Sequence, residues 1–195
     1  MMHQSAEIVT IDGPIHEVLR TKTDPIKEDE LPLARDIANL LLASLKPHMP
    51  AAGLAAPQVG ISKSVFIFSY DRDPKNLEVV INPIFTPIGT SQVTGWEGCF
   101  SVILCKSGWK LAFVPRYETI RVSYLNLDGE KVEKVLEGFA AKVFQHEFDH
   151  LQGIECIDRP DAVIKSFDSR EELLAYLQEV KSQDSTRYIK LKNVH

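Results

Sequence analysis

Hydrophobic side chains recur at helical spacing in the first quarter of the chain, at Leu33, Ile37, Leu40, Leu41 and Leu45. Residues three and four apart lie on one face of a helix, so this stripe predicts an amphipathic helix with a buried apolar face. Asp29 is the expected N-cap, and Pro32 is tolerated in the first turn. The helix is expected to run to about Lys46.

A second helical pattern covers residues 138–152, which contain no proline and no glycine after Gly138. The apolar face of this helix is formed by Phe139, Val143, Phe144 and Leu151. Gly153 is the expected C-terminal stop, because glycine readily adopts the left-handed conformation that ends many helices.

Alternating hydrophobic and polar residues, rich in β-branched and aromatic types, predict several strands. The predicted strands are Glu7–Ile11, Ser64–Tyr70, Leu77–Asn82, Ile84–Ile88, Tyr117–Leu125 and Lys131–Leu136. Asp128 and Gly129 separate the last two, which is a strong signal for a β-hairpin. Strands follow strands without alternating helices, so the expected fold class is α+β. Antiparallel β-sheets would pack around the second helix, with an N-terminal and a C-terminal helix beside them.

The C-terminal helix is expected to begin after Asp168 or Ser169 and to run through Val180. A mobile polar tail is expected from about residue 182. With 195 residues, no repeat and no linker-like segment, residues 1–195 are expected to form a single domain.

Composition narrows the function classes only weakly. The formal net charge of −5 disfavours a specific nucleic-acid site. No segment has the length and hydropathy of a membrane span, so no membrane association is expected. Residues 1–11 resemble neither a signal peptide nor a transit peptide, and we therefore expect a bacterial cytoplasmic location.

The second predicted helix contains the segment Gln145-His146-Glu147-Phe148-Asp149-His150, which includes the pattern H-E-x-x-H. On a helix, His146 and His150 point to the same side, where both imidazoles can bind one metal ion. Glu147 lies one position round the helix, which suits a general base better than a third ligand. The alternative is a buried amphipathic helix whose histidines only form hydrogen bonds, and the specificity of the pattern favours the metal site.

A catalytic metal site of this kind has three protein ligands and one open position. The three cysteines, at 99, 105 and 156, are odd in number and argue against a disulfide framework. Glu155 and Cys156, just past the helix, are poor candidates for the third ligand. By chemistry alone, Cys99, Cys105, Cys156 and the other histidines stay open, and each cysteine can also be a small buried apolar residue.

Three separated motifs together resemble the peptide deformylase family. The family pattern G-x-G-L-A-A-x-Q matches Ala51 to Gln58 except at its first position. The pattern E-G-C-L-S matches Glu97 to Ser101 except at Phe100, and Q-H-E-x-D-H matches Gln145 to His150 in full. The resemblance extends from about Ile8 to Arg159, in the family's order and spacing.

The resemblance implies a metal-dependent amide hydrolase that removes the N-terminal formyl group from N-formylmethionyl peptides and releases formate. Nascent chains near the ribosome would be its partners, and a monomer is expected. The implied metal ligands are Cys99, His146 and His150. One iron(II) ion per chain is implied, with zinc, nickel or cobalt as substitutes. Glu147 would take a proton from water and return it to the leaving amine.

The family's substrate contacts carry over to the first two motifs and to the helix. Gln58 and the backbone N–H of Phe100 would stabilise the oxyanion. The backbone of Gly53 and Leu54 would pair with an extended peptide as an added strand. Val143 could line an apolar pocket for the methionine side chain, or could equally belong to the core.

Three departures from the family pattern raise hypotheses. Ala51 replaces a glycine and would be strained if that position needed a positive φ. Phe100 replaces a leucine and could narrow the substrate groove, although its backbone N–H is kept. Residues 103–113 form a longer and more apolar segment than expected, and we predict that they form a flap beside the cleft.

Two neighbours of the metal motifs also have candidate roles. Glu97 could pair with Arg116 beneath the metal-binding loop. Asp149 could support the metal site from behind, or could be a surface carboxylate.

Two functional alternatives stay open at this level. One is a different amidase or peptidase that uses the same site, and the other is a non-catalytic metal-binding homologue.

Overall fold

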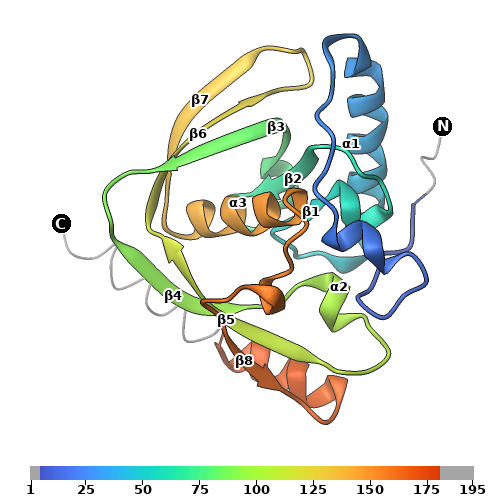
Figure 1. Cartoon of the computed structure of the whole chain (residues 1–195), viewed down its shortest axis with the longest axis vertical. Coiled ribbons are helices and arrows are strands. Elements are labelled where there is room, and N and C mark those ends of the chain that lie inside the picture. The colour runs from blue at the N-terminus through green and yellow to red at the C-terminus, as the bar shows by residue number, and fades with distance from the viewer. Residues whose placement is uncertain (1–4, 181–195) are drawn as a thin grey trace.

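The chain has an α+β fold, as predicted (Figure 1), and the computed structural model describes residues 5–180. One sheet has the order β1-β2-β3-β6-β7, with strands Gly53–Ala55, Val65–Ser69, Leu77–Pro87, Thr119–Leu125 and Lys131–Glu137. The other has the order β4-β5-β8, with strands Gln92–Glu97, Lys110–Tyr117 and Val163–Ser166. The strand pairs of both sheets are antiparallel. The α-helices are α1 (Leu31–Leu45), α2 (Phe100–Ile103), α3 (Gly138–Leu151) and a helix over 170–180.

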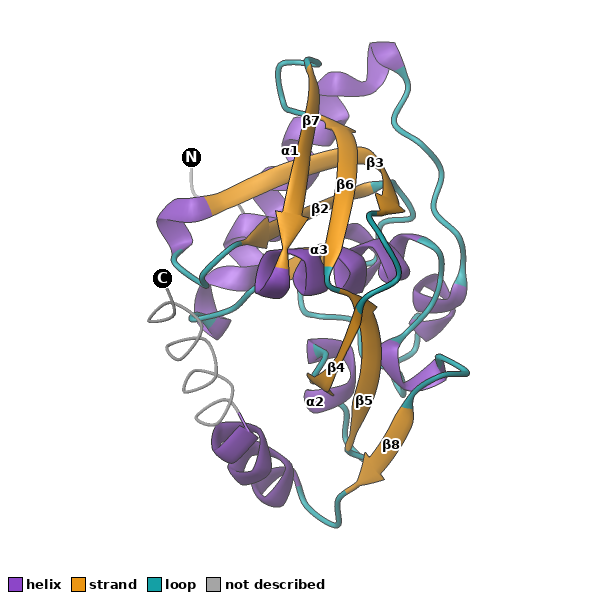
Figure 2. Ribbon diagram, turned by 90° about the vertical axis from the view of Figure 1, so that its left-hand side faces the viewer, coloured by secondary structure: helices purple, strands orange, loops and turns teal. Residues whose placement is uncertain are grey.

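Helix α3 lies between the two sheets, as both views show (Figures 1 and 2). Strand β2 is buried at all five of its positions, because helices cover both of its faces. Its residues Val65 and Ile67 pack in the same cluster as the buried side of α1. Its residues Phe66 and Phe68 pack against Phe144 of α3, with ring centroids 5.1 and 5.5 Å away. Side chains alternate between faces along a strand, so an uninterrupted apolar run suits this two-sided burial.

The hairpin and the two terminal helices are confirmed. Strands β6 and β7 pair from Thr119↔Glu137 to Leu125↔Lys131, around the predicted turn. The helix over 170–180 is capped by Ser169, whose Oγ accepts a hydrogen bond from the backbone N–H of Glu172 at 3.2 Å. The tail expected from about 182 lies outside the described residues, and the single domain over 1–195 stays a prediction.

The prediction of a strand at Glu7–Ile11 is wrong. This segment is irregular because its N–H groups bond to two loops. Val9 donates to the carbonyl of Gln58 at 2.8 Å, and Ile11 donates to the carbonyl of Ser101 at 3.0 Å. The N-terminal segment therefore joins the two loops that carry the first and second motifs.

The start of α1 also differs from the prediction. Asp29 lies within a 3₁₀ turn, Glu28–Glu30, and caps nothing, whereas the Glu30 carboxylate accepts a hydrogen bond from the N–H of Lys27 at 2.9 Å. Leu33 is 40% exposed, and the small residues Ala34 and Ala38 are buried in its place. The buried stripe is therefore turned slightly round the helix from the predicted one.

The strand predictions for Leu77–Asn82 and Ile84–Ile88 merge into the single strand β3, which has a bulge between Ile81 and Ile84. Asn82 has φ 49° at this bulge, and its side chain bonds to the backbone N–H and C=O of Ile26. Proline removes a ladder hydrogen bond but is tolerated at a bulge. Pro83 therefore bends the strand without ending it.

The small sheet was largely missed by sequence reasoning. Lys110–Phe113 belongs to β5 and pairs with β4 and β8, so the prediction of a flap over residues 103–113 is wrong for this part. Leu111 and Ala112 are fully buried, which explains the apolar character of the segment. Within residues 5–180, no helix has the length and apolar character needed to cross a lipid bilayer.

Replacing Phe144 with alanine tests the packing of α3 on the large sheet. The side chain is fully buried and contacts three aromatic rings, so we expect a loss of about 3–5 kcal/mol in the free energy of unfolding. Denaturant unfolding measures this loss. Val135→Ala, at a 49% exposed position of β7, should change stability by less than about 0.5 kcal/mol. Equal effects of the two substitutions would contradict this description of the core.

Candidate active site

Three side chains converge where α3 meets the end of β4. Cys99 follows β4 and directly precedes α2, while His146 and His150 are one turn apart on α3. Ligand atoms of Cys99, His146 and His150 all lie within 4.8 Å of one another. The Cys99 Sγ is 3.4 Å from the His150 Nε2. Metal bonds of about 2.3 Å to sulfur and about 2.1 Å to nitrogen at a tetrahedral angle place the two donors about 3.6 Å apart. These three residues therefore fit a tetrahedral metal ion with one open position.

A carboxylate lies behind each histidine. The Nδ1 of His146 is 2.8 Å from the Oε2 of Glu97, and the Nδ1 of His150 is 3.1 Å from the Oε1 of Glu155. A carboxylate at Nδ1 fixes the tautomer that leaves the Nε2 lone pair for a metal. Once each imidazole is neutral, the carboxylate at Nδ1 thus keeps Nε2 as the free ligand atom.

A second group of possible ligands contains Glu97, His146 and Cys156. Its chemistry is less suitable for a metal ion. Both Glu97 oxygens already accept hydrogen bonds from Arg116, and one of them also faces His146. Among the described residues, the group of Cys99, His146 and His150 is therefore the better metal site.

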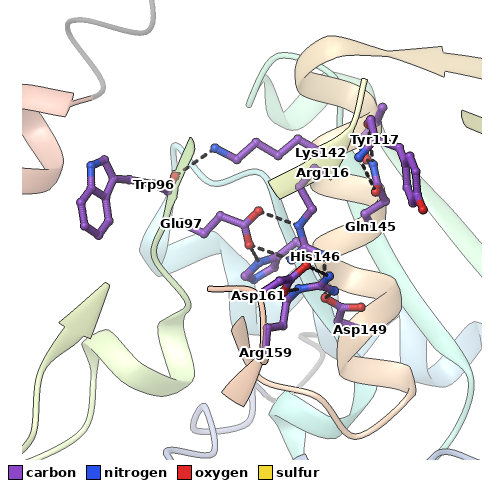
Figure 3. Close-up of polar contacts among 11 residues, drawn as sticks. Trp96, Glu97, Arg116, Tyr117, Lys142, Gln145, His146, Asp149, Arg159 and Asp161 are labelled. Atoms are coloured by element: carbon purple, nitrogen blue, oxygen red, sulfur yellow. Dashed lines mark hydrogen bonds and ion pairs between the residues drawn. The ribbon is translucent and has the colours of Figure 1, made fainter. Parts of the chain in front are cut away.

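Arg116 of β5 links the metal-binding loop to α3 (Figure 3). Its Nε and Nη2 each donate to Glu97 at 2.8 Å, and its Nη1 lies 2.6 Å from the Oδ2 of Asp149. Arg159 donates to the same Asp149 oxygen at 2.9 Å and also pairs with Asp161. The predicted pair of Glu97 and Arg116 is therefore present. Asp149 is a buried member of this network, not a surface carboxylate.

The network keeps its groups charged although they are buried. Burial alone raises the pKa of Glu97, but hydrogen bonds and charge from Arg116 and His146 lower it far below its ordinary value. Burial likewise lowers the pKa of Arg116, and the two carboxylates more than offset this effect. Buried ions of opposite charge that share hydrogen bonds compensate one another in this way.

Glu147 of α3 lies against β1, where glycine makes room for it. A Cβ at Gly53 would stand 2.5 Å from the Oε1 of Glu147 and 2.8 Å from the carbonyl oxygen of Ile67. The Oε2 of Glu147 is buried and has no hydrogen-bond partner within the described part of the chain. Burial raises the pKa of Glu147, an effect that the nearby His146 and His150 partly oppose. A carboxylate with a raised pKa and a free oxygen suits a general base.

Protonation of the ligands depends on their surroundings. Burial raises the pKa of the Cys99 thiol well above its ordinary value. Burial lowers the pKa of His150, but the charge and hydrogen bond of Glu155 raise it to about 9. A metal ion must therefore displace protons when it binds to these two side chains.

The two predicted oxyanion donors lie beside Cys99. Gln58 is held by the N–H of Ala55, which donates to its Oε1 at 2.9 Å, so the amide nitrogen points toward the site. That Nε2 lies 3.3 Å from both the Sγ of Cys99 and the Oγ of Ser101. Phe100 is the first residue of α2, where the N–H group has no acceptor inside the helix.

The predicted substrate contacts lie on α3 and β1. Leu54 is fully buried in the cluster beneath α1, and Val143 is buried with Ala55 and Phe144 in the core beside α3. Sequence reasoning missed Lys142, whose Nζ donates to the carbonyl of Trp96 at 2.9 Å (Figure 3). This hydrogen bond ties α3 to β4 one turn before His146.

The departures from the family pattern have clear structural outcomes. Ala51 is not among the described residues with a positive φ, so alanine is unstrained there. The Phe100 ring packs against His48, with 5.1 Å between ring centroids. Cys105 is buried, and its Sγ lies 2.8 Å from the carbonyl oxygen of Val102 and 2.9 Å from that of Ser107, so it belongs to a turn and not to the metal site.

Sequence reasoning also missed Glu155, which it treated only as a poor metal ligand. A usable signal was present. A metal-binding histidine almost always donates its second N–H to a carboxylate, carbonyl or water, and Glu155 follows His150 by five residues.

The chain is similar to known proteins over most of its length. The polypeptide deformylase family model matches residues 5–166. Peptide deformylase from Thermotoga petrophila is 39% identical over 142 residues, which cover 73% of this chain and 80% of that protein. Peptide deformylase 1 from Prochlorococcus marinus is 37% identical over 162 residues, with 78% and 79% covered.

Solved structures show the same similarity. The crystal structure of peptide deformylase from Thermotoga maritima matches with a TM-score of 0.68 and 36% identity, covering 80% of this chain and 98% of that chain. A Met-Ala-Ser-bound class I type b peptide deformylase from Acinetobacter baumannii matches with a TM-score of 0.69 and 32% identity, covering 80% and 99%.

Gly53→Ala tests the close approach of Glu147 to β1. The added methyl group would displace Glu147 or the backbone of β1, and we expect kcat/KM to fall about 100-fold while metal content is kept. Metal analysis beside a hydrolysis assay measures both quantities. Gly13→Ala, where the nearest atom to a Cβ is Thr10 O at 3.1 Å, is the control. Wild-type kinetics of Gly53→Ala would refute this account of the site.

Arg116→Ala removes the cation shared by Glu97 and Asp149. Loss of one partner from a buried ion pair leaves uncompensated charge, so we expect a loss of about 3–5 kcal/mol in unfolding free energy. We also expect lower metal occupancy after dialysis, because Glu97 no longer holds His146 firmly. Arg121→Ala, at an exposed position of β6, serves as the matched control. Unchanged metal occupancy in Arg116→Ala would show that the network does not support the metal site.

Proposed function

Because this chain belongs to the polypeptide deformylase family, we propose that it hydrolyses the N-terminal formamide of N-formylmethionyl peptides at the site of Cys99, His146 and His150. One observation gives this assignment of the site its strongest support. A buried Glu147 with an unpartnered carboxylate oxygen lies beside three convergent metal-ligand side chains. A purely structural metal site needs no such base, so this feature favours catalysis over the non-catalytic alternative.

Each site residue has a distinct task in the proposed reaction. Cys99, His146 and His150 would hold the metal ion, which would supply Lewis acidity and lower the pKa of water at the site. Glu147 takes the proton from the attacking water and then delivers it to the departing amine nitrogen. The water oxygen forms a bond to the formyl carbon and the C–N bond of the formamide breaks, so the products are formate and a peptide with a free amino group.

Gln58 and Phe100 stabilise the negative charge that develops on the formyl oxygen. The amide of Gln58 is already oriented by Ala55, so its N–H groups need little rearrangement when that charge appears. Preorganised donors of this kind typically contribute about 3 kcal/mol each to transition-state stabilisation. The N–H of Phe100 points out of the first turn of α2 as the second donor.

The substrate peptide is proposed to lie between two strand edges. Within residues 5–180, β1 pairs only with β2 and β4 pairs only with β5, so each has one edge that no other described strand covers. Glu147 touches β1, and Lys142 is hydrogen-bonded to β4, so both edges border the same part of α3. An extended peptide can add to such an edge through backbone hydrogen bonds, here at Gly53 and Leu54. Val143 is proposed to support the wall of the methionine pocket.

Several finer properties follow from the same proposal. We propose iron(II) as the metal, because the family resemblance favours it. A single thiolate with two imidazoles suits zinc as well, and cobalt or nickel can substitute. We also propose that the enzyme acts as a monomer on nascent chains near the ribosome, in the bacterial cytoplasm.

Glu147→Gln tests the general base. We expect formate release from formyl-Met-Ala-Ser to fall about 10²- to 10⁴-fold, because the amide cannot accept the proton of water. Anaerobically prepared, iron-loaded protein should keep its metal in this variant. Glu133→Gln, at an exposed site on β7, should behave like the wild type. Wild-type formate release by Glu147→Gln would exclude this residue as the base. No release by the metal-loaded wild type would point to a different amide substrate.

A further inference from the structure

Glu155 is a fully buried carboxylate that the proposed reaction does not use. The chain leaves α3 through Gly153, which has φ 73°, and the N–H of Ile154 then returns to the carbonyl of Asp149 at 3.0 Å. This tight turn places Glu155 behind His150, with 0% of its surface exposed. Its Oε1 faces the Nδ1 of His150 at 3.1 Å, while its Oε2 is buried without a hydrogen-bond partner in the described structure.

The two carboxylates behind the histidines differ in how their charge is balanced. Glu97 receives two hydrogen bonds from Arg116, so a guanidinium offsets its negative charge. The ion pairs among residues 5–180 give Glu155 no arginine or lysine. Its carboxylate faces His150 and also interacts with the thiol of Cys99. Glu97 therefore mainly orients His146, whereas Glu155 brings to the metal site a negative charge that no arginine or lysine of the described chain offsets.

A divalent metal ion in a buried site needs this charge. The thiolate of Cys99 contributes one negative charge, and neutral His146 and His150 contribute none. The negative charge of Glu147 is not fixed, because this carboxylate accepts and releases a proton in each turnover of the proposed reaction. A buried ion without a compensating charge is strongly disfavoured, and Glu155 is the remaining fixed anion in contact with a ligand.

We propose that Glu155 is a positioning residue that holds His150 with Nε2 toward the metal ion and supplies the second fixed negative charge that retains a divalent ion. The inference rests on the metal site of the proposed function. It does not depend on the substrate, because it concerns metal retention. Glu97 does not supply this charge, because Arg116 offsets its carboxylate.

The test is the rate at which cobalt-loaded protein loses its metal to an excess of chelator. Glu155→Gln keeps an oxygen acceptor for the Nδ1–H of His150 but removes the charge, and we expect release about 10- to 100-fold faster than in the wild type. Glu155→Leu removes both functions and should release cobalt faster still. The visible absorption of thiolate-bound cobalt should shift in both variants, because the ligand field at His150 changes.

Two further variants keep the test decisive. Glu155→Asp keeps the charge but shortens the side chain, so it should retain cobalt longer than Glu155→Leu even if Glu155→Gln does not fold. Glu118→Gln, at an exposed glutamate that bonds to Ser91, should release cobalt at the wild-type rate. Unfolding of the metal-free proteins shows whether any change comes from lost stability.

The proposal is overturned if Glu155→Gln keeps the wild-type release rate and spectrum, or if the aspartate and leucine variants release cobalt equally fast. A wild-type protein that retains cobalt in the expected manner but releases no formate would refute the proposed reaction and leave this inference standing. If the wild type releases formate and Glu155→Gln retains cobalt like the wild type, this inference is refuted and the proposed reaction stands.

Discussion

The site depends on one buried set of ionic contacts, in which Arg116 joins Glu97 to Asp149. These three residues come from β5, from the end of β4 and from α3, so the network connects the small sheet to the central helix. Cys99 is two residues beyond Glu97, and His146 is three residues before Asp149. The ionic contacts therefore set the distance between a cysteine and a histidine that lie 47 positions apart in sequence. Arg159 also pairs with Asp149, so two arginines balance the charges of Glu97 and Asp149, which stabilises these ions in a low-dielectric interior.

Space around α3 is the second constraint. Gly53 lets β1 approach Glu147 so closely that no side chain can fit between them. On the opposite side, Lys142 reaches the backbone of β4 at Trp96. The base, the metal ligands and the two strand edges thus meet around the same helix. Short distances at this site come from the meeting of two sheets on one helix, and no loop has to close to create them.

Much of this arrangement could be predicted from the sequence, because local patterns determine it. The H-E-x-x-H spacing places His146 and His150 on one face of a helix. The Asp128-Gly129 pair predicts the turn between β6 and β7. The third ligand could not be chosen by chemistry alone, since Cys99, Cys105 and Cys156 are all buried. The family resemblance selected Cys99, and the geometry brings it beside His150.

Features that depend on distant contacts were harder to predict. The segment Glu7–Ile11 has a strand-like composition, yet its backbone bonds to two loops that are close only in the folded chain. Lys110–Phe113 resembled an apolar flap because its partner strands are short and separated from it in sequence. β4 comes before α2, and β8 follows only after α3. The role of Glu155 depends on the turn at Gly153, which aims the carboxylate back at His150.

Strand β2 is covered by α1 on one face and α3 on the other, and it pairs with β1 and β3 along its two edges. Its backbone amides are therefore shielded from solvent on both faces and at both edges, so we expect their exchange to require global unfolding. In deuterated water these amides would be the last to exchange, at a rate set by global stability. Because β1 is paired to this strand and carries Gly53, the wall of the active site is anchored to the part of the molecule that opens least.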